Sequence, residues 1–273
     1  MQITTIIIGK NSNLSRAMLN RQSDFILISS RSLSLDIDIL NQYKRKKINL
    51  IFNNFQPATQ LDKFNNLAKY IENSILTTSR VLDYFQNTII NKIIYTSSSS
   101  VYGNNILCNE EDGLKPLNLH ASLKISNEKL IEQFCMKNSI DYTITRVFNI
   151  YGGSDKFSII SKIIDSYLNK KELIIINNGN AIRDFIHIED VASVYLRLLN
   201  VKDIKILNVG TGEGVSIKSI LDYLSNNGIN IQIKNITKKE LKVSTSDNKL
   251  LYDYLKIRSF AKIENFLKVK LNL

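Results

Sequence analysis

The sequence predicts an α/β protein with a doubly wound parallel sheet, and three features support this fold class. Apolar, β-branched segments of strand length alternate with segments of helical periodicity over most of the 273 residues, which is typical of parallel strands joined by right-handed helical crossovers. The first strand-like segment ends in a glycine that leads directly into a helical segment. Polar clusters follow several strand-like segments, and open parallel sheets bind their ligands at these strand ends.

Each expected strand rests on a run rich in isoleucine, valine or tyrosine, because β-branched and aromatic side chains suit a pleated sheet. In chain order these runs are TTIIIG (4–9), DFILISSR (24–31), INLIFNN (48–54), NKIIYTSSSS (91–100), DYTITRVFNIYG (141–152), ELIIINN (172–178) and KILNVG (205–210). The last two are predicted to be buried strands. No internal repeat or low-complexity linker interrupts the alternation.

Each expected helix rests on helical character between two strands, where apolar residues recur three or four positions apart. In chain order the helices are predicted at 13–22, at 65–86, around Lys124 as far as about Asn138, at 157–171 and at 217–228. The alternation of these helices with the strands predicts crossovers that cover the sheet.

Composition indicates a globular chain that binds small anions rather than nucleic acid. Hydrophobic residues make up 44% and charged residues 22% of the chain, and the net charge is +11. The densest basic cluster, YKRKK (43–47), is interpreted as a solvated helix end, with a phosphate-binding patch as the alternative. Aromatic and basic residues do not alternate as a site for single-stranded nucleic acid requires. We therefore expect no nucleic-acid partner.

The few cysteines and histidines argue against a metal site. Cys108 and Cys135 lie far apart, and the two histidines, His120 and His187, have no metal-ligand spacing. His187 alternates with apolar neighbours along a strand, so we expect a packed or rim histidine and assign it no role. The first ten residues lack a basic leading segment, and their apolar run is too short for a secretion signal or a membrane span. The expectation is a cytoplasmic protein with no membrane partner.

The turn after the first strand, GKNSNLS (9–15), predicts a site for a dinucleotide. Such folds favour glycine at positions 9, 12 and 15, and the chain has Gly9, Ser12 and Ser15 there. Glycine lets the backbone turn close to a pyrophosphate, which then rests on helix N–H groups. Serine is small, and its hydroxyl can donate to phosphate. The expected cofactor contacts are Gly9, Ser12, Asn13, Leu14 and Ser15, and a plain connection is the alternative.

The second strand is followed by SSRS (29–32), which has no acidic residue to hold a ribose 2′-OH. Arg31 stands there instead, next to Ser30. A guanidinium flanked by hydroxyls suits a 2′-phosphate, so we expect NADP as the cofactor, with NAD as the alternative. The structural alternative is an exposed arginine at a strand end.

Six motifs occur in order: IIIGKNSNLS (6–15), TSSSSVYG (96–103), KPLNLHASLKISNEKL (115–130), RVFNIYGG (146–153), RDFIHIEDVA (183–192) and ILNVGTGEGVS (206–216). In these motifs the chain resembles the extended short-chain dehydrogenase/reductases, specifically their nucleotide-sugar epimerase/dehydratase branch. The resemblance implies a Rossmann dinucleotide-binding domain over residues 1–152. It also implies a C-terminal substrate-binding part over residues 153–273 that interleaves with the core.

The resemblance also implies roles for individual residues. Ser98 is similar to the family's catalytic Ser/Thr and Lys124 to its catalytic lysine, which also contacts the cofactor. Asn73 is similar to an asparagine near the nicotinamide. Asn149 and Arg183 resemble residues that bind the substrate's diphosphate, and Ser98 and Ser99 are expected to meet the sugar. A planar guanidinium suits a diphosphate, although Arg183 could instead pair with Asp184, Glu189 or Asp190.

His120 stands where the resemblance predicts the tyrosine of a Tyr-x-x-x-Lys motif. The spacing keeps His120 and Lys124 on one helix face, but imidazole titrates near pH 6.5 and phenol near pH 10. Lys124 would lower the pKa of His120 and leave a neutral base that is a weaker proton donor. His120 is therefore interpreted as a working acid/base, as a bystander, or as a sign of lost turnover.

The implied reaction is hydride transfer on a nucleoside diphosphate sugar. Dehydratases of this branch carry an acid within the motif that here reads SSSSVYG, and its absence argues against dehydration. Arg31 favours reduction of a 4-keto-sugar nucleotide by NADPH, and 4-epimerisation is the alternative. A protein that binds NADP or a sugar nucleotide without turnover is the alternative from another class. By resemblance, the helix at 65–86 and the helix of Lys124 would pair in a homodimer.

Overall fold

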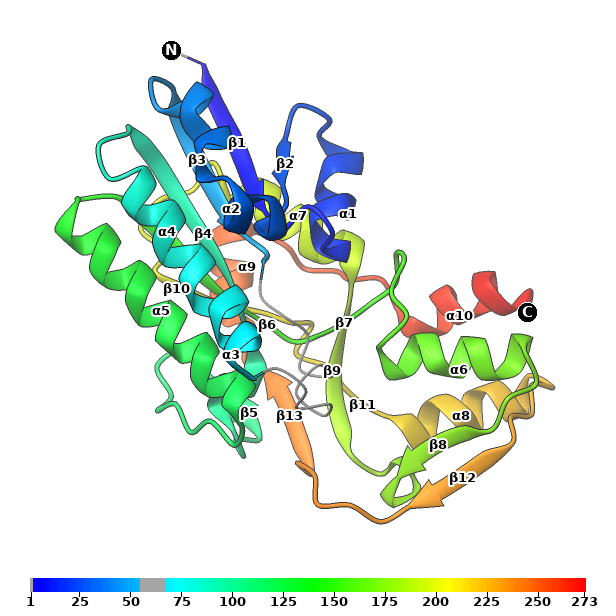
Figure 1. The fold of residues 1–273 in the computed structure, drawn as a ribbon. Coiled ribbons are helices and arrows are strands. Elements are labelled where there is room, and N and C mark those ends of the chain that lie inside the picture. Colours follow the sequence, from blue (N-terminus) through cyan, green and yellow to red (C-terminus); the bar gives the residue numbers. More distant parts are fainter. Residues whose placement is uncertain (1, 55–66) are drawn as a thin grey trace.

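A six-stranded parallel sheet forms the centre of the protein, which a computed structural model describes over residues 2–54 and 67–273. Every neighbouring pair of its strands is parallel, so the predicted fold class is confirmed (Figure 1). From one edge to the other the strands are β2 (Ile26–Ile28), β1 (Ile3–Ile8), β3 (Lys47–Phe52), β4 (Ile90–Ser98), β6 (Asp141–Val147) and β10 (Ile206–Val209).

The strand order places a crevice between the ends of β1 and β3. The chain passes from β1 to β2 on one side and returns to β3 on the other side of β1. The chain leaves β1 for β2 on one side and leaves β3 for β4 on the other, so these two crossovers run in opposite directions and the loops after β1 and β3 separate. Ligands of open α/β sheets bind at such a switch point.

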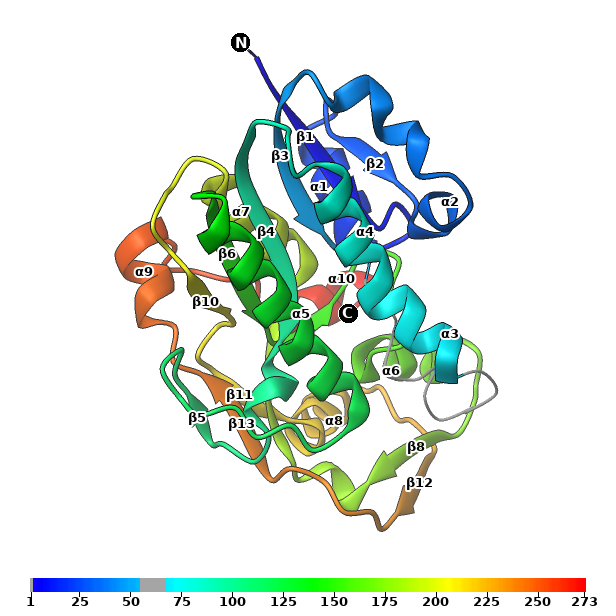
Figure 2. The same ribbon diagram turned by 60° about the vertical axis from the view of Figure 1, so that its left-hand side comes forward.

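Helices cover both faces of the sheet because alternate side chains of each strand point to opposite faces. Ile7 of β1 packs in a cluster with α1 (Asn13–Arg21), α7 (Ile188–Leu198) and α9 (Lys249–Leu255). Ile6 and Ile8 pack in a second cluster with α2 (Ser30–Leu35), the 3-10 helix η1 (Ile37–Tyr43), α4 (Thr77–Tyr84) and α5 (Leu119–Lys137). Figure 2 shows α4 and α5 in front of the sheet.

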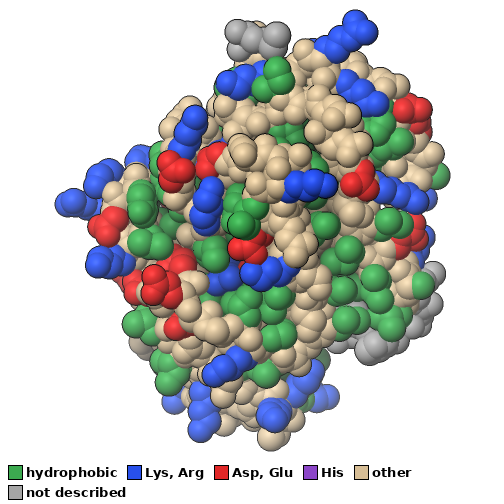
Figure 3. Space-filling view, turned by 90° about the vertical axis from the view of Figure 1, so that its left-hand side faces the viewer, with side chains coloured by type: hydrophobic (Ala, Val, Ile, Leu, Met, Phe, Trp, Pro, Cys, Tyr) green, Lys and Arg blue, Asp and Glu red, His purple; other side chains and the backbone are tan. Residues whose placement is uncertain are grey.

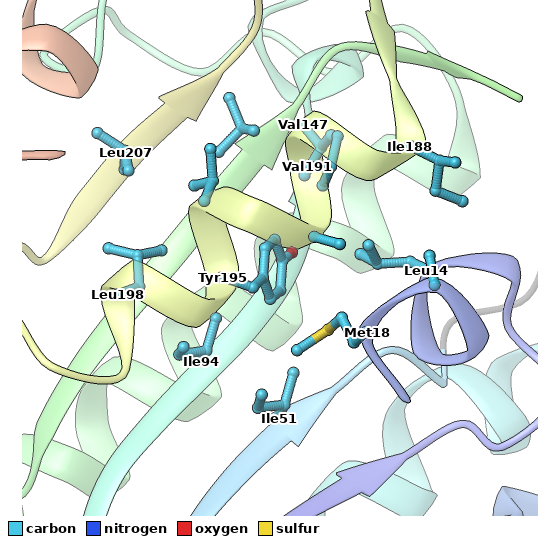
Figure 4. Packing of buried hydrophobic residues seen from close by; sticks show 14 of the residues in the cluster. Leu14, Met18, Ile51, Ile94, Val147, Ile188, Val191, Tyr195, Leu198 and Leu207 are labelled. Carbon is cyan, nitrogen blue, oxygen red and sulfur yellow. The ribbon is translucent and has the colours of Figure 1, made fainter. Parts of the chain in front are cut away.

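Two hydrogen bonds inside the first cluster also fix α7 on the sheet. Tyr195 of α7 lies among Leu14, Met18, Ile51 and Ile94 (Figure 4). Its hydroxyl lies 2.6 Å from the hydroxyls of Thr96 on β4 and Thr145 on β6. A buried phenol needs such partners, and these bonds fix α7 over the C-terminal half of β4, next to the ligand crevice.

The C-terminal part contains two smaller sheets. One has the order β11 (Gly214–Ser216), β9 (Ile182–His187), β13 (Val243–Ser246), β5 (Leu107–Cys108), with β7 (Asn149–Tyr151) also paired to β9; the other pairs β12 (Ile233–Ile236) with β8 (Leu173–Ile176). A third cluster joins α6 (Ile159–Leu168), α8 (Ile217–Asn226) and α10 (Ile263–Leu271). β10 lies in the central sheet, and α7 and α9 pack against that sheet. The interleaving of the two parts stays a prediction. The boundary at residue 152 stays a prediction.

Two sequence-based predictions need correction. The run 141–152 is not one strand, because β6 ends at Val147 in the central sheet and β7 begins at Asn149 in another sheet. The run 172–178 is not a buried strand. Its β8 lies in the two-stranded sheet, with Ile174 55% exposed, because one face of that sheet has no covering layer among the described residues.

The predicted helix at 65–86 is interrupted by a wider turn. Within the described residues it consists of α3 (Leu67–Ile71), the π-helical turn η3 (Glu72–Leu76) and α4, which ends at Tyr84. Its first two positions, 65 and 66, lie outside the described residues. The other predicted helices occur with small shifts of their ends. Within 2–54 and 67–273, every helix is too short or too polar to cross a membrane.

His187 is packed, as the alternation of its neighbours predicts. It ends β9 and caps α7, where its Nδ1 accepts a hydrogen bond from the Glu189 amide at 3.3 Å. Its ring centre lies 5.1 Å from that of Tyr151 and 5.3 Å from that of Phe266. The ring therefore belongs to the packing between β7 and α10.

Candidate active site

Gly9 brings the first turn against the end of β3. Its φ of +114° is a backbone conformation that side-chain-bearing residues rarely adopt. A Cβ at this position would lie 2.5 Å from the Asn53 carbonyl oxygen. Because the chain has no Cβ here, the β1–α1 turn fits closely against the β3 end and opens toward the crevice.

A cleft of about 940 Å³ follows this turn across the carboxyl ends of β1, β2 and β3. It connects the turn with Asn53, Asn54 and the loop after β7, through Ser154 and Asp155. Six of the predicted cofactor residues line the cleft: Gly9, Ser12, Asn13, Ser30, Arg31 and Asn73. The cleft thus brings together the turn after β1, the start of α2 after β2, and the helical turn η3.

The residues of the cleft fit a nicotinamide dinucleotide. The nine-residue helix α1 begins here and directs its first N–H groups to the turn, as an anion site requires. Ser12 stands at the helix cap, and its side chain makes no capping hydrogen bond. The amide Nδ2 of Asn54 is buried and has no partner among the described residues. These donors suit the oxygens of a diphosphate and its riboses.

Two predicted cofactor residues lie elsewhere. Ser15 is fully buried, and its hydroxyl accepts a hydrogen bond from Asn53 Nδ2 at 3.1 Å. Leu14 is 4% exposed and packs in the core below α1, although it borders a smaller cavity beside the cleft. A small residue at position 15 therefore serves close packing of α1 on β3, and we assign it no phosphate contact.

Asn13 ties the turn to the loop after β7. Its Nδ2 donates to the Gly152 carbonyl at 2.9 Å, and its Oδ1 accepts from the amide and the hydroxyl of Ser154, both at 3.0 Å. Gly153 lies so close that a Cβ there would be 2.7 Å from Asn13 Oδ1. The side-chain amide of Asn13 thus holds the loop after β7 in place as one wall of the cleft.

Lys124 lies at the inner end of the same space. A smaller cavity of about 230 Å³ is lined by Lys124, and it shares Ser12, Asn13 and Asn53 with the large cleft. Lys124 Nζ donates to the Thr96 carbonyl of β4 at 2.5 Å and lies 5.3 Å from the Tyr95 ring centre. Burial lowers the pKa of Lys124 to about 7. The amine therefore titrates near neutral pH.

His120 lies one turn before Lys124, at the start of α5. Asn118 caps this helix by accepting a hydrogen bond from the Ala121 amide at 2.9 Å. The Nδ1 atom of His120 lies 2.9 Å from the hydroxyl of Tyr70 on α3. Burial, and then the positive charge of Lys124, lower the pKa of His120 to about 4. The imidazole is therefore neutral at pH 7, as the sequence predicts.

The serines at the end of β4 lie near the same helix. Ser97 donates to the buried carboxylate of Glu128, which also pairs with Arg146 at 2.8 Å. Ser98 ends the strand, and its hydroxyl accepts hydrogen bonds from the amide and hydroxyl of Ser100. Ser98 and Ser99 are half-buried, Ser99 in the 3-10 turn η4 (Ser99–Tyr102). The bonds from Ser97 and Lys124 hold the end of β4 beside α5.

Asn149 and Arg183 line one further pocket, of about 360 Å³. β7 and β9 pair in parallel, with Asn149 opposite Phe185. The next residue on β7, Ile150, lines the small cavity beside Lys124. Neighbouring residues of β7 thus border the two cavities. Lys162 joins Arg183 in the pocket, which gives it two cationic side chains suited to an anionic ligand.

The expected alternative partners of Arg183 are wrong. Its guanidinium instead donates to the Leu241 carbonyl at 2.7 Å and lies 3.5 Å from Glu240. The carboxylates that sequence adjacency suggested are all engaged elsewhere: Asp184 accepts from Thr211, Gly212 and Ser246, Glu189 pairs with Arg21, and Asp190 accepts from the Ala261 amide. Arg183 is thus held at the pocket by residues far along the chain.

The sequence prediction missed several lining residues. Asn53 and Asn54 directly follow a predicted strand, so the rule that ligands bind at strand ends could have identified them. Tyr70, Lys162 and Glu240 carry no such signal, because neither spacing nor residue type distinguishes them from surface residues of their segments.

The predicted homodimer would form through the face that α3, α4 and α5 make. Figure 3 shows this side of the molecule, where hydrophobic side chains gather between lysine and arginine side chains. Exposed apolar side chains on this face include Ile71 of α3, Leu76 of η3 and Met136 of α5. Pairing of two copies through this face stays a prediction.

The sequence pattern of the NAD dependent epimerase/dehydratase family matches residues 8–210. A Methanocaldococcus jannaschii protein with the provisional name UDP-glucose 4-epimerase is 28% identical over 229 residues, which are 80% of this chain and 72% of that protein. A dTDP-D-glucose 4,6-dehydratase of Dictyostelium discoideum is 29% identical over 199 residues, 67% of this chain and 46% of that protein. The chain thus spans about half the length of the second relative.

Solved structures support the same fold. A UDP-N-acetylglucosamine 4-epimerase from Methanobrevibacter ruminantium, in complex with UDP-N-acetylmuramic acid, superimposes with a TM-score of 0.87 at 21% identity, covering 98% of this chain and 97% of that one. A UDP-glucuronic acid 4-epimerase from Bacillus cereus, in complex with UDP-glucuronic acid and NAD, gives 0.85 at 20% identity, covering 98% of each chain. At these identities the likeness concerns the fold.

Proposed function

Since the chain belongs to the NAD dependent epimerase/dehydratase family, we propose that it changes a nucleoside diphosphate sugar by hydride transfer at one carbon. One observation carries the proposal. The cavity that Lys124 lines shares residues with the cleft at the glycine turn, and His120 lies on the same helix one turn away. A dinucleotide in the cleft and a sugar beside Lys124 would therefore meet at a proton-transfer group.

The chain's own residues have distinct tasks in this proposal. The turn from Gly9 to Asn13 receives the cofactor's diphosphate at the start of α1, and Asn73 faces its nicotinamide end. Arg183 and Asn149 hold the diphosphate of the sugar nucleotide in the pocket that they line. When bound, the nicotinamide accepts and returns hydride. His120 takes up the proton that leaves the sugar hydroxyl, and Ser98, at the end of β4, contacts the sugar.

Among the reactions of this class, 4-epimerisation has the best support. A neutral imidazole, with its pKa lowered to about 4, takes up a proton in the oxidation that begins an epimerisation, whereas it is a poor proton source for a ketone. Relatives that are named 4-epimerases also favour epimerisation over reduction. The sequence alone favoured reduction of a 4-keto-sugar nucleotide, and Arg31 at the cleft is the observation that keeps this second candidate.

The cofactor test is a fluorescence titration with NADPH and NADH at equal ionic strength. If Arg31 binds a 2′-phosphate, NADPH binds more tightly than NADH, and Arg31→Ala lowers the NADPH affinity about tenfold. Arg45→Ala changes an exposed arginine outside the cleft and serves as the control. Equal affinities, unaffected by Arg31→Ala, would remove the support for NADP and for the reductase.

The activity test uses UDP- and dTDP-sugars with the preferred cofactor and follows the products by NMR. Formation of the 4-epimer without net change in cofactor supports the epimerase. Consumption of NADPH with a 4-keto-sugar nucleotide supports the reductase. Tight binding of cofactor and sugar nucleotide without either product would leave a binding protein that has lost turnover.

A further inference from the structure

His120, which stands where the resemblance predicts a tyrosine, has a tyrosine from another helix within hydrogen-bond distance. The hydroxyl of Tyr70 lies 2.9 Å from His120 Nδ1, although the two residues are fifty positions apart in the chain. Tyr70 is 5% exposed. A buried phenol requires a polar partner, and the imidazole supplies one.

The local backbone holds Tyr70 in this place. The π-helical turn η3 (Glu72–Leu76) begins two residues after Tyr70 and interrupts the helix between α3 and α4. Asn127 of α5 donates through Nδ2 to the Ser74 carbonyl in this turn at 2.7 Å. Single π-turns occur frequently at functional sites. The bond between η3 and α5 fixes the distance between the helices that carry Tyr70 and His120.

The contact at Nδ1 decides which ring nitrogen serves the reaction. Each nitrogen of a neutral imidazole has one role, donor or acceptor, and a hydrogen bond at one nitrogen selects the role of the other. Two tautomers fit this contact; when Nδ1 donates its proton to the Tyr70 hydroxyl, Nε2 is the acceptor that can take a proton from a sugar.

We propose that Tyr70 is a positioning residue for His120: its hydroxyl accepts the Nδ1–H and so keeps Nε2 as the base. This rests on the proposed function, because a base is needed only if a sugar hydroxyl is oxidised. In the oxidation, the sugar's carbon-bound hydrogen leaves as hydride to the nicotinamide, and its hydroxyl proton goes to Nε2. The C–O bond becomes a carbonyl. In the return step the hydride and the proton move back.

This arrangement keeps one hydrogen bond through the whole cycle. The neutral ring with its proton at Nδ1 and the imidazolium both donate Nδ1–H to Tyr70, so no side chain needs to turn when the proton arrives. Burial raises the pKa of Tyr70 to about 12, and the phenol therefore keeps its proton and its orienting role at pH 7. Tyr70 thus orients His120, and His120 acts on the sugar hydroxyl, in the same way as a third group orients the base at other base-activated sites.

The first experiment measures the tautomer of His120 by ¹⁵N NMR on the protein without substrate. The chain has two histidines, so His187→Gln assigns both rings. The expected result is a proton at Nδ1 of His120 in the wild type, and population of the Nε2–H tautomer in Tyr70→Phe. The control is Tyr254→Phe, which changes a tyrosine that is 51% exposed. A wild-type Nε2–H tautomer, or no change in Tyr70→Phe, would overturn the proposal.

The second experiment compares kcat and KM of the same variants on the active sugar nucleotide. Misplacement of a base by about 1 Å reduces rates about 100-fold, so Tyr70→Phe should lower kcat by that order and leave KM unchanged. An unchanged kcat would also refute the role of Tyr70. If the wild type has no turnover but the tautomer depends on Tyr70, the proposed function fails and the positioning role stands. Circular dichroism verifies that each variant is folded.

Discussion

Replacement of Lys124 by methionine should remove a pH dependence of folding stability that this one side chain produces. Lys124 is 5% exposed, and burial lowers its pKa from the ordinary 10.5 to about 7. Between these two values the unfolded chain binds the proton and the folded protein releases it. Because the unfolded state then holds more protons, stability increases with pH in this window, and below about pH 7 the full penalty for the buried ammonium is present.

The magnitude follows from the two pKa values. Each pH unit inside the window changes the free energy of unfolding by up to 1.36 kcal/mol. With rounding near the folded pKa, Lys124 should contribute a gain of about 2 kcal/mol between pH 7 and pH 9. Methionine has no ionisable group, so Lys124→Met should lack this gain. Any loss of packing in the variant does not depend on pH and cancels in the comparison of slopes.

The assay is urea denaturation of the wild type and Lys124→Met at pH 7, 8 and 9, followed by far-ultraviolet circular dichroism because the chain has no tryptophan. Lys129→Met removes a lysine from the same helix whose side chain is 64% exposed, and it should keep the wild-type slope. Identical slopes for the wild type and Lys124→Met would refute the claim that the buried amine is neutral in the folded protein above pH 7.

Three further substitutions test the packing of the site. Gly9→Ala should destabilise the fold by about 2 kcal/mol or more, because of the positive φ and the backbone that a Cβ would meet; Gly113→Ala, with open space around it, should be neutral in thermal unfolding. Arg146→Met should lose about 3–5 kcal/mol of stability in urea denaturation, because Glu128 remains as a buried unpaired charge. Adding Glu128→Gln should restore part of this stability. A double variant as unstable as Arg146→Met would show that the unpaired charge is not the cause. Asn13→Ala should lose about 1 kcal/mol of stability and weaken cofactor binding in the fluorescence titration; unchanged binding would refute the role of the loop as a wall of the cleft.

The elements of the central sheet were predictable because their signals are local. The strand ending at Ile8, the turn at Gly9 and the helix after it are each determined by neighbouring residues. Alternation of strands and helices then leaves a parallel sheet as the consistent arrangement. The same locality explains why His120 and Lys124 could be placed on one helix face from their spacing.

The remaining errors all involve partners that are distant in sequence. The run 141–152 divides at Phe148 because its second half pairs with β9, and nothing inside the run records that pairing. Arg183 meets Glu240, fifty-seven positions later, rather than the carboxylates next to it. Tyr70 meets His120 for the same reason. Sequence patterns therefore located the candidate site, and the tertiary structure supplied its partners.

The separate ribbon of β8 and β12 has a consequence for how this protein can diversify. Residues 174–176 of β8 form one wall of the pocket that contains Arg183, and both strands lie outside the central sheet. Selection for a different ligand can alter this wall by mutation or by exchange of the whole ribbon, while the strands that hold the dinucleotide cleft keep their register. Such changes leave the pairing of β1, β2 and β3 untouched.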